Sequence, residues 1–156
     1  MAVTDEETAS FFKQDSITKA LKMVLFDELK KMRLLLVDDD QWIRDSLSLY
    51  FEAEGCHLFA LETAEEGTEA VKKQDYDIII SDYRLPGMDG LEFLKRIKEA
   101  QPHAIRVLIT AYGSKALVSE AKRIGIQGFI EKPFTCRTIE ASLSRILLKR
   151  EQEDQG

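Results

Sequence analysis

Five short apolar runs are spread along the chain, and each is followed by a stretch whose apolar residues recur at helical spacing. The runs cover residues 33–37, 57–61, 77–81, 105–110 and 128–131. Continuous apolar runs of this length are typical of strands buried on both faces of a parallel sheet. Strands that alternate with helices are joined by right-handed crossovers, so the pattern predicts an α/β fold with a doubly wound, five-stranded parallel sheet and helices on both faces.

The segment before the first strand lies outside this repeat. Residues 4–15 are polar and acidic apart from two phenylalanines, and they predict no helix or strand. The next apolar residues fall near helical spacing and predict an amphipathic helix; they are Ile17, Leu21, Val24, Leu25 and Met32. Three interpretations stay open: a dimerisation or docking element, a helix folded onto its own domain, or an upstream extension with Met23 or Met32 as alternative starts. The expected divisions are a partly helical N-terminal extension (1–32), one α/β domain (33–150) and a polar tail (151–156).

Composition and charge narrow the class of protein. The 156 residues, 44% hydrophobic and 32% charged, are typical of one globular domain. A net charge of -6 without a basic arm argues against direct nucleic-acid binding. No apolar run approaches the ~18 residues of a membrane span, and the first ten residues are acidic, unlike a signal peptide. Cys56 and Cys136 form no CxxC pair, which favours a reduced, cytoplasmic setting. Together with the lack of a membrane span, this leads us to expect a soluble, cytoplasmic protein with no membrane partner.

Polar residues stand at the carboxyl ends of four of the five predicted strands. They are Asp38 and Asp39 after the first, Asp82 after the third, Thr110 after the fourth and Lys132 after the fifth. In an open α/β sheet these ends meet at one edge, where ligands bind, so we expect the side chains to converge. The acidic run 38–40 alone could be a helix N-cap with a solvated turn. Asp82 and Lys132 at the same edge make that interpretation less favourable.

These residue types suit one kind of chemistry. Neighbouring carboxylates raise one another's pKa unless a cation compensates their charge. Mg²⁺ prefers oxygen ligands, and usually only a few of these come from the protein while water supplies the rest. A carboxylate beside Mg²⁺ can attack phosphorus and form an acyl phosphate. A lysine and a threonine hydroxyl can stabilise the group being transferred. The set therefore indicates phosphoryl transfer to Asp82 with Mg²⁺ as cofactor.

Over roughly residues 33–149 the chain resembles the receiver domain of two-component response regulators. Four motifs carry the resemblance, in the family's order and at its spacing: LLLVDDD (34–40), IIISDYRLPGMDG (78–90), VLITAYG (107–113) and GFIEKPF (128–134). It implies a CheY-like, flavodoxin-like sheet with strand order 2-1-3-4-5. It also implies a phosphorelay in which a sensor histidine kinase or phosphotransfer protein donates the phosphoryl group.

The resemblance also assigns roles at the site. Asp82 is implied as the phosphoacceptor and a metal ligand, Asp39 as the direct metal ligand, and Asp38 as an acid that holds the metal through water. The backbone carbonyl of Arg84 is implied as a further ligand. Lys132 is implied to pair with the acceptor carboxylate and then with the phosphoryl group, and its bond to Pro133 is expected to be cis.

A switch and an output face are implied as well. The Thr110 hydroxyl would move toward the phosphoryl group while the Phe129 ring turns inward, which alters the face formed by the helix after residue 114, the strand 128–131 and the last helix. The output partner is unknown. A phosphorylation-dependent homodimer is one output, although GIQGF (125–129) lacks the acidic pair of many DNA-binding relatives that dimerise there.

Enzymatic activity would be limited to self-catalysed phosphoryl transfer and autodephosphorylation. We hypothesise that Arg84 and Tyr112 shield the acyl phosphate from water.

Two other functions compete with this interpretation. Asp38 and Asp40 form a DxD motif, as in haloacid-dehalogenase-like Mg²⁺ phosphatases, which would use Asp38 as nucleophile but typically need a longer chain. A degenerate receiver serving only as a scaffold is the other alternative. The complete set of three aspartates, a threonine and a lysine argues against it.

Overall fold

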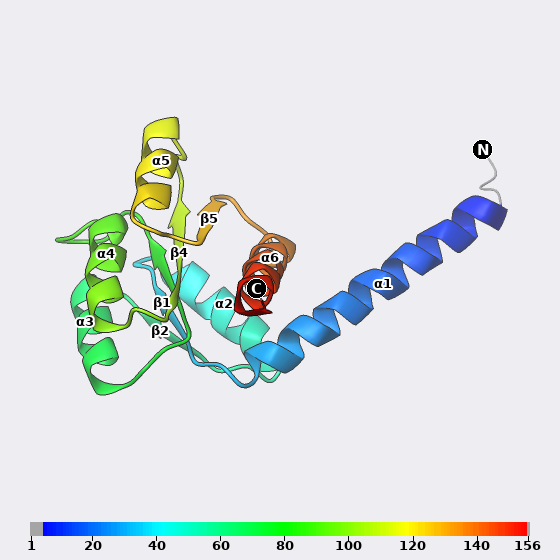
Figure 1. Cartoon of the computed structure of the whole chain (residues 1–156), viewed down its shortest axis with the longest axis horizontal. Coiled ribbons are helices and arrows are strands. Elements are labelled where there is room, and N and C mark those ends of the chain that lie inside the picture. Colours follow the sequence, from blue (N-terminus) through cyan, green and yellow to red (C-terminus); the bar gives the residue numbers. More distant parts are fainter. Residues whose placement is uncertain (1–4, 156) are drawn as a thin grey trace.

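A parallel sheet of five strands forms the centre of the computed structural model, which describes residues 5–155. The strands are β1 (Leu34–Val37), β2 (Leu58–Leu61), β3 (Ile78–Asp82), β4 (Ile105–Thr110) and β5 (Gly128–Glu131). They lie in the order β2-β1-β3-β4-β5, and every neighbouring pair is parallel. The predicted doubly wound fold and its strand order are therefore confirmed (Figure 1).

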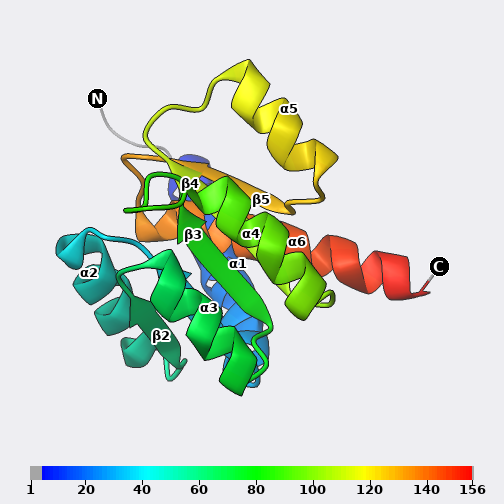
Figure 2. The ribbon, with the colours of Figure 1, turned by 90° about the vertical axis from the view of Figure 1, so that its left-hand side faces the viewer.

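Helices cover both faces of the sheet, as Figure 2 shows. One face carries α2 (Gln41–Ala53), α6 (Cys136–Gln155) and the end of α1 (Asp5–Leu29); the other carries α3 (Ala64–Lys73), α4 (Gly90–Ala100) and α5 (Lys115–Arg123). Successive side chains of a strand point to opposite faces. Leu34 and Leu36 of β1 accordingly join the first apolar cluster, and Leu35 and Val37 join the second.

Several loops at the carboxyl edge of the sheet are fixed by helix caps. Asp40 accepts a hydrogen bond from the Trp42 N–H at 2.8 Å at the start of α2. Asp89 accepts one from the Glu92 N–H at 2.8 Å at the start of α4. Each cap satisfies a backbone donor that the helix itself leaves free, typically stabilising the helix by about 1 kcal/mol. The loops that carry the candidate site therefore enter well-defined helices.

The N-terminal helix is longer than the sequence pattern predicts. It begins at Asp5, within the segment for which no element is expected, and extends away from the sheet (Figure 1). Its last turns pack on the domain, because Leu25, Phe26 and Leu29 are only 5%, 3% and 0% exposed. The Phe26 ring lies edge-on to Tyr50 of α2, with centroids 5.8 Å apart. The interpretation of a helix folded onto its own domain thus describes the end of α1.

The C-terminal residues also differ from expectation. Helix α6 continues to Gln155, so residues 151–155 are helical where a polar tail is predicted. None of the helices in residues 5–155 combines the length and the apolar character of a membrane-spanning segment.

Candidate phosphoryl-acceptor site

Three predicted aspartates meet at the carboxyl edge of the sheet. Asp38 and Asp39 follow β1, Asp82 ends β3, and one carboxylate oxygen from each lies within 4.8 Å of the others. Asp38 is 0% exposed and Asp82 is 5% exposed, whereas Asp39 faces solvent. The expected convergence is found, with two carboxylates buried and one accessible.

Lys132 lies between the two buried carboxylates. Its Nζ is 3.3 Å from Asp38 Oδ2 and 3.2 Å from Asp82 Oδ1. The main chain supports the same arrangement, because the Lys132 N–H donates to the Thr110 carbonyl at 2.7 Å and the Lys132–Pro133 bond is cis, as expected. One ammonium group therefore neutralises part of the charge of two acids that come from different strands.

Burial sets the protonation of this cluster. Burial, together with the charge of Asp82, raises the pKa of Asp38 to about 6, although the Asp40 N–H and Lys132 oppose the shift. Burial also raises the pKa of Asp82 against the opposing charge of Lys132. Burial would lower the pKa of Lys132, but the two carboxylates outweigh it and raise that pKa. The lysine stays charged, and the acids ionise less readily than exposed ones.

The carboxylate set fits a magnesium ion. All three side chains offer oxygen, the ligand that Mg²⁺ requires, and the exposed Asp39 leaves one side open to water. Asp38 Oδ2 is buried with the Lys132 ammonium 3.3 Å away, while Oδ1 accepts a hydrogen bond from the Asp40 N–H at 2.9 Å. A divalent cation would compensate the charge that one lysine cannot balance among three acids.

Thr110 ends β4, the strand next to β3, at the same edge of the sheet. Its side chain is 3% exposed, and its Oγ1 accepts a hydrogen bond from the Tyr112 N–H at 3.1 Å and donates to the Tyr112 carbonyl at 3.3 Å. Tyr112 itself is 74% exposed, and the Arg84 guanidinium carbon lies 5.8 Å from the centre of its ring. Arg84 and Tyr112 thus form a cation–π pair at the edge of the site.

Two residues of the site escape prediction from sequence. At Gly90, a Cβ would collide with the carbonyl oxygen of Asp82, and the Gly90 N–H donates to the Tyr83 carbonyl at 2.6 Å. Arg44 donates through NH1 to the Asp38 carbonyl at 2.8 Å. Gly90 ends the MDG sequence, a signal for a turn, and is the first residue of α4; its close approach to β3 depends on the fold.

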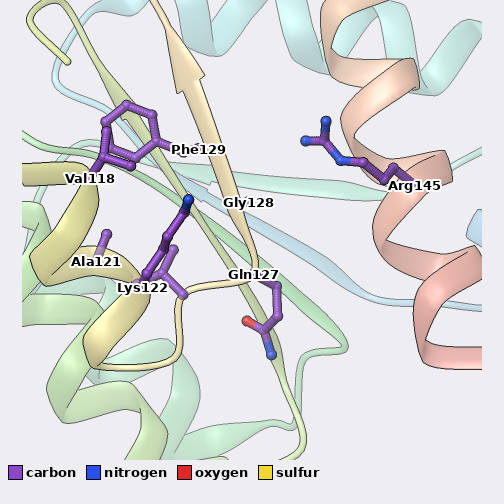
Figure 3. A pocket seen from close by; sticks show the side chains of 8 residues that line it. Val118, Ala121, Lys122, Gln127, Gly128, Phe129 and Arg145 are labelled. Atoms are coloured by element: carbon purple, nitrogen blue, oxygen red, sulfur yellow. The ribbon is translucent and has the colours of Figure 1, made fainter. Parts of the chain in front are cut away.

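A pocket of about 310 Å³ lies beside β5, between α5 and α6 (Figure 3). Phe129 projects from the strand on the α5 side, near Val118, and Arg145 projects from α6 on the other side. The Phe129 ring is half-buried against the second apolar cluster. The predicted output face therefore contains a hollow next to the residue predicted to move.

Comparison with known proteins identifies the family. The sequence profile described as "Response regulator receiver domain" matches residues 34–144, so the chain belongs to the receiver domains of two-component response regulators. It is 32% identical over 115 residues to Sporulation initiation phosphotransferase F of Bacillus subtilis, covering 74% of this chain and 93% of that protein. It is 33% identical to Chemotaxis protein CheY-3 of Vibrio cholerae, covering 75% of this chain and 92% of that protein.

Other relatives are longer. The chain spans about half the length of two transcriptional regulatory proteins. It covers 59% of FixJ of Bradyrhizobium diazoefficiens and 52% of ResD of Bacillus subtilis. Among solved structures, a CheY-like receiver domain protein from Methanospirillum hungatei JF-1 has a TM-score of 0.70 at 31% identity, covering 80% of this chain and 98% of that one. The comparisons give no support to the phosphatase alternative.

Proposed function

We propose that this receiver takes a phosphoryl group on Asp82 from the phosphohistidine of a sensor kinase or phosphotransfer protein. One Asp82 oxygen attacks phosphorus, the bond from phosphorus to the histidine nitrogen breaks, and the imidazole leaves with the electron pair of that bond. The product is an acyl phosphate on Asp82. The observation that carries this proposal is the position of Lys132, within 3.3 Å of both Asp38 and Asp82 at a cluster of three carboxylates.

The neighbouring residues would bind the metal ion and stabilise the phosphoryl group during transfer. Asp38, Asp39, Asp82 and the Arg84 carbonyl are the proposed holders of Mg²⁺, which when bound neutralises charge on the transferring oxygens. The Lys132 ammonium would pair first with the Asp82 carboxylate and then with the transferred phosphoryl group. Thr110 would exchange its bonds with the Tyr112 backbone for one to a phosphoryl oxygen. Autodephosphorylation would be the only other reaction.

The proposed output couples the site to the face formed by α5, β5 and α6. When Thr110 moves, the space that it leaves can take the Phe129 ring, which now lies half-buried beside the pocket. Phenylalanine carries no hydroxyl, so the ring contributes packing alone. Each ~1.4 kcal/mol of preference for one conformation changes the population ratio tenfold, so a modest phosphate contact is sufficient. The output partner, another protein or a second receiver, would bind the altered face.

Labelling with acetyl phosphate and Mg²⁺ tests the acceptor directly. Intact-protein mass spectrometry should show a gain of one phosphoryl group in the wild type and in Asp45→Asn, whose carboxylate is exposed on α2. Asp82→Asn should not gain it. Labelling of Asp82→Asn at the wild-type rate, with loss only in Asp38→Asn, would instead support nucleophilic use of Asp38.

A further inference from the structure

Most of the described side chains of helix α1 do not pack against the domain. The helix is 25 residues long, yet every described side chain in residues 5–20 is exposed, and only the last turns pack on α2 and α6 (Figure 1). Helices without tertiary contacts are marginal in water even at a length of about 15 residues. A projecting helix of this kind gains stability when another chain covers it.

An apolar stripe runs along the projecting part. Ile17, Leu21 and Val24 are 45%, 64% and 64% exposed, and their spacing of four and three residues places them on one side of the helix. Of the side chains that bind the domain, Phe26 lies on the opposite side of the helix, and Leu25 lies next to Leu21 at the border of the stripe. The Ile17 stripe, as we call these three residues, is therefore free while α1 stays anchored.

Charges beside the stripe indicate what covers it. Lys13, Ala20 and Asp27 are spaced by seven residues, so they share one flank of the stripe, with opposite charges at the two ends and a small residue at the centre. Asp27 is well exposed, its side chain 70% accessible, and the nearest ammonium, Lys30, lies 3.9 Å away. A helix with this flank is complementary to a second copy of itself that runs in the opposite direction.

We propose that α1 forms an antiparallel helix pair with α1 of a second copy. Ile17 packs against the partner's Leu21, and Leu21 against the partner's Ile17. On the flank, Lys13 pairs with the partner's Asp27, Asp27 with the partner's Lys13, and the two Ala20 side chains meet at the centre. Such layers with flanking ion pairs are those of a two-stranded coiled coil.

A parallel pair is less favourable. It would place Glu28, on the same side as the stripe, opposite the partner's Glu28, and it would leave Lys13 and Asp27 about 21 Å apart along the axis, at 1.5 Å per residue. The antiparallel pair also places the two receiver domains at opposite ends of the helices. The stripe does not include Asp82, so this dimer is independent of the phosphoryl-transfer proposal and of phosphorylation.

Sedimentation equilibrium of the full chain over a concentration series tests the interface. We expect a reversible monomer–dimer equilibrium without phosphate donor, and at least a tenfold higher dimer Kd for Leu21→Glu, equivalent to about 1.4 kcal/mol. Lys19→Gln is the matched control, since the Lys19 side chain is 75% exposed on the side of the helix opposite the stripe, and its Kd should stay within about twofold of the wild type. A monomer at every concentration, or equal effects of both variants, would overturn the proposal.

Charge reversal tests the direction of the helices. Lys13→Glu and Asp27→Lys should each weaken the dimer, and the double variant should recover most of the wild-type affinity, because each new glutamate then faces a new lysine. Far-UV circular dichroism should show that all variants remain folded. A double variant no tighter than the weaker single variant would exclude the antiparallel alignment.

Discussion

Asp38 is the residue on which the electrostatics of the site depend most. It is fully buried, and its pKa is raised to about 6 from an ordinary 3.8. A carboxyl group whose pKa is higher in the folded state binds its proton more tightly there than in the unfolded chain. The free energy of unfolding therefore falls as pH rises from about 4 to about 6, and above that range the buried carboxylate destabilises the metal-free protein.

The first prediction concerns Asp38→Asn in the presence of EDTA. Because the amide carries no charge, the variant should be more stable than the wild type at pH 7.5 by about 1–3 kcal/mol, and this gain should shrink at pH 5. Urea denaturation at both pH values measures it. A stability difference independent of pH would contradict the assignment, and Mg²⁺ at pH 7.5 should stabilise the wild type more than the variant.

Arg84 and Tyr112 lead to a second prediction at the same scale. Their cation–π pair lies beside the site, where we expect it to restrict water from the acyl phosphate. Replacing both with alanine should speed loss of the phosphoryl group by roughly threefold to tenfold, a barrier reduction of about 1 kcal/mol. The decay of ³²P-labelled protein gives the rate. Arg96→Ala, on the surface of α4, should match the wild type, and an unchanged rate in the double variant would disprove the shielding role.

The charged residues of the site were predictable because each directly follows an apolar run. Parallel strands place such positions at one edge of the sheet, so the proximity of Asp38, Asp82 and Lys132 could be predicted from the sequence alone. Arg44 and Gly90 could not. Arg44 reaches back from α2 to a carbonyl, and Gly90 is required by the distance between α4 and β3, and neither contact leaves a periodic signal in the sequence.

At the scale of elements, the junction between β3 and α4 gives the third prediction. A methyl group at Gly90 would overlap the Asp82 carbonyl, so Gly90→Ala must push α4 away from the strand that carries the proposed acceptor. We expect a loss of about 2 kcal/mol or more in the free energy of unfolding, together with slower labelling by acetyl phosphate. Gly87→Ala is the control: Gly87 has a φ of 80° but open space around it, so only about 1 kcal/mol of backbone strain is expected. Equal losses would mean that the close approach is unimportant.

Helix α1 shows what periodicity alone misses. Residues 5–16 contain few apolar side chains at helical spacing, so the pattern locates only the later part of the helix. That part is also where the apolar residues contact the domain. Of the buried anchoring residues, the pattern includes Leu25 but neither Phe26 nor Leu29, because Ile17, Leu21 and Val24 set an apolar period on the exposed side of the helix.

The fourth prediction concerns the anchor of α1. Phe26 is 3% exposed and packs against Tyr50 and Phe51, so Phe26→Ala should cost about 3 kcal/mol or more of stability. Met23→Ala, on an exposed side of the same helix, should change stability by less than about 0.5 kcal/mol. Urea denaturation at low protein concentration separates this effect from association. A small loss in the phenylalanine variant would show that α1 is not part of the cooperative domain.

At the scale of the whole molecule, the site and the pocket are linked through β4 and β5. Thr110 ends β4 and pairs in register with Glu131 of β5, two residues beyond Phe129. The Phe129 ring borders the same pocket as Val118 of α5 and Arg145 of α6. Thr110 and the proposed output face are therefore connected through adjacent strands, and the fifth prediction tests whether a change at Thr110 reaches that face.

Beryllofluoride with Mg²⁺, which mimics an aspartyl phosphate, should shift the backbone amide resonances of Phe129 and Arg145 in ¹⁵N spectra. Thr110→Val removes the hydroxyl while keeping the shape of the side chain, so binding should persist with smaller shifts at these two amides. Lys13, on the projecting part of α1, is the internal control and should not shift in either protein. If the valine variant showed full shifts at Phe129 and Arg145, the threonine hydroxyl would not couple the site to the output face, and the coupling would have to run through Lys132, whose N–H bonds the Thr110 carbonyl.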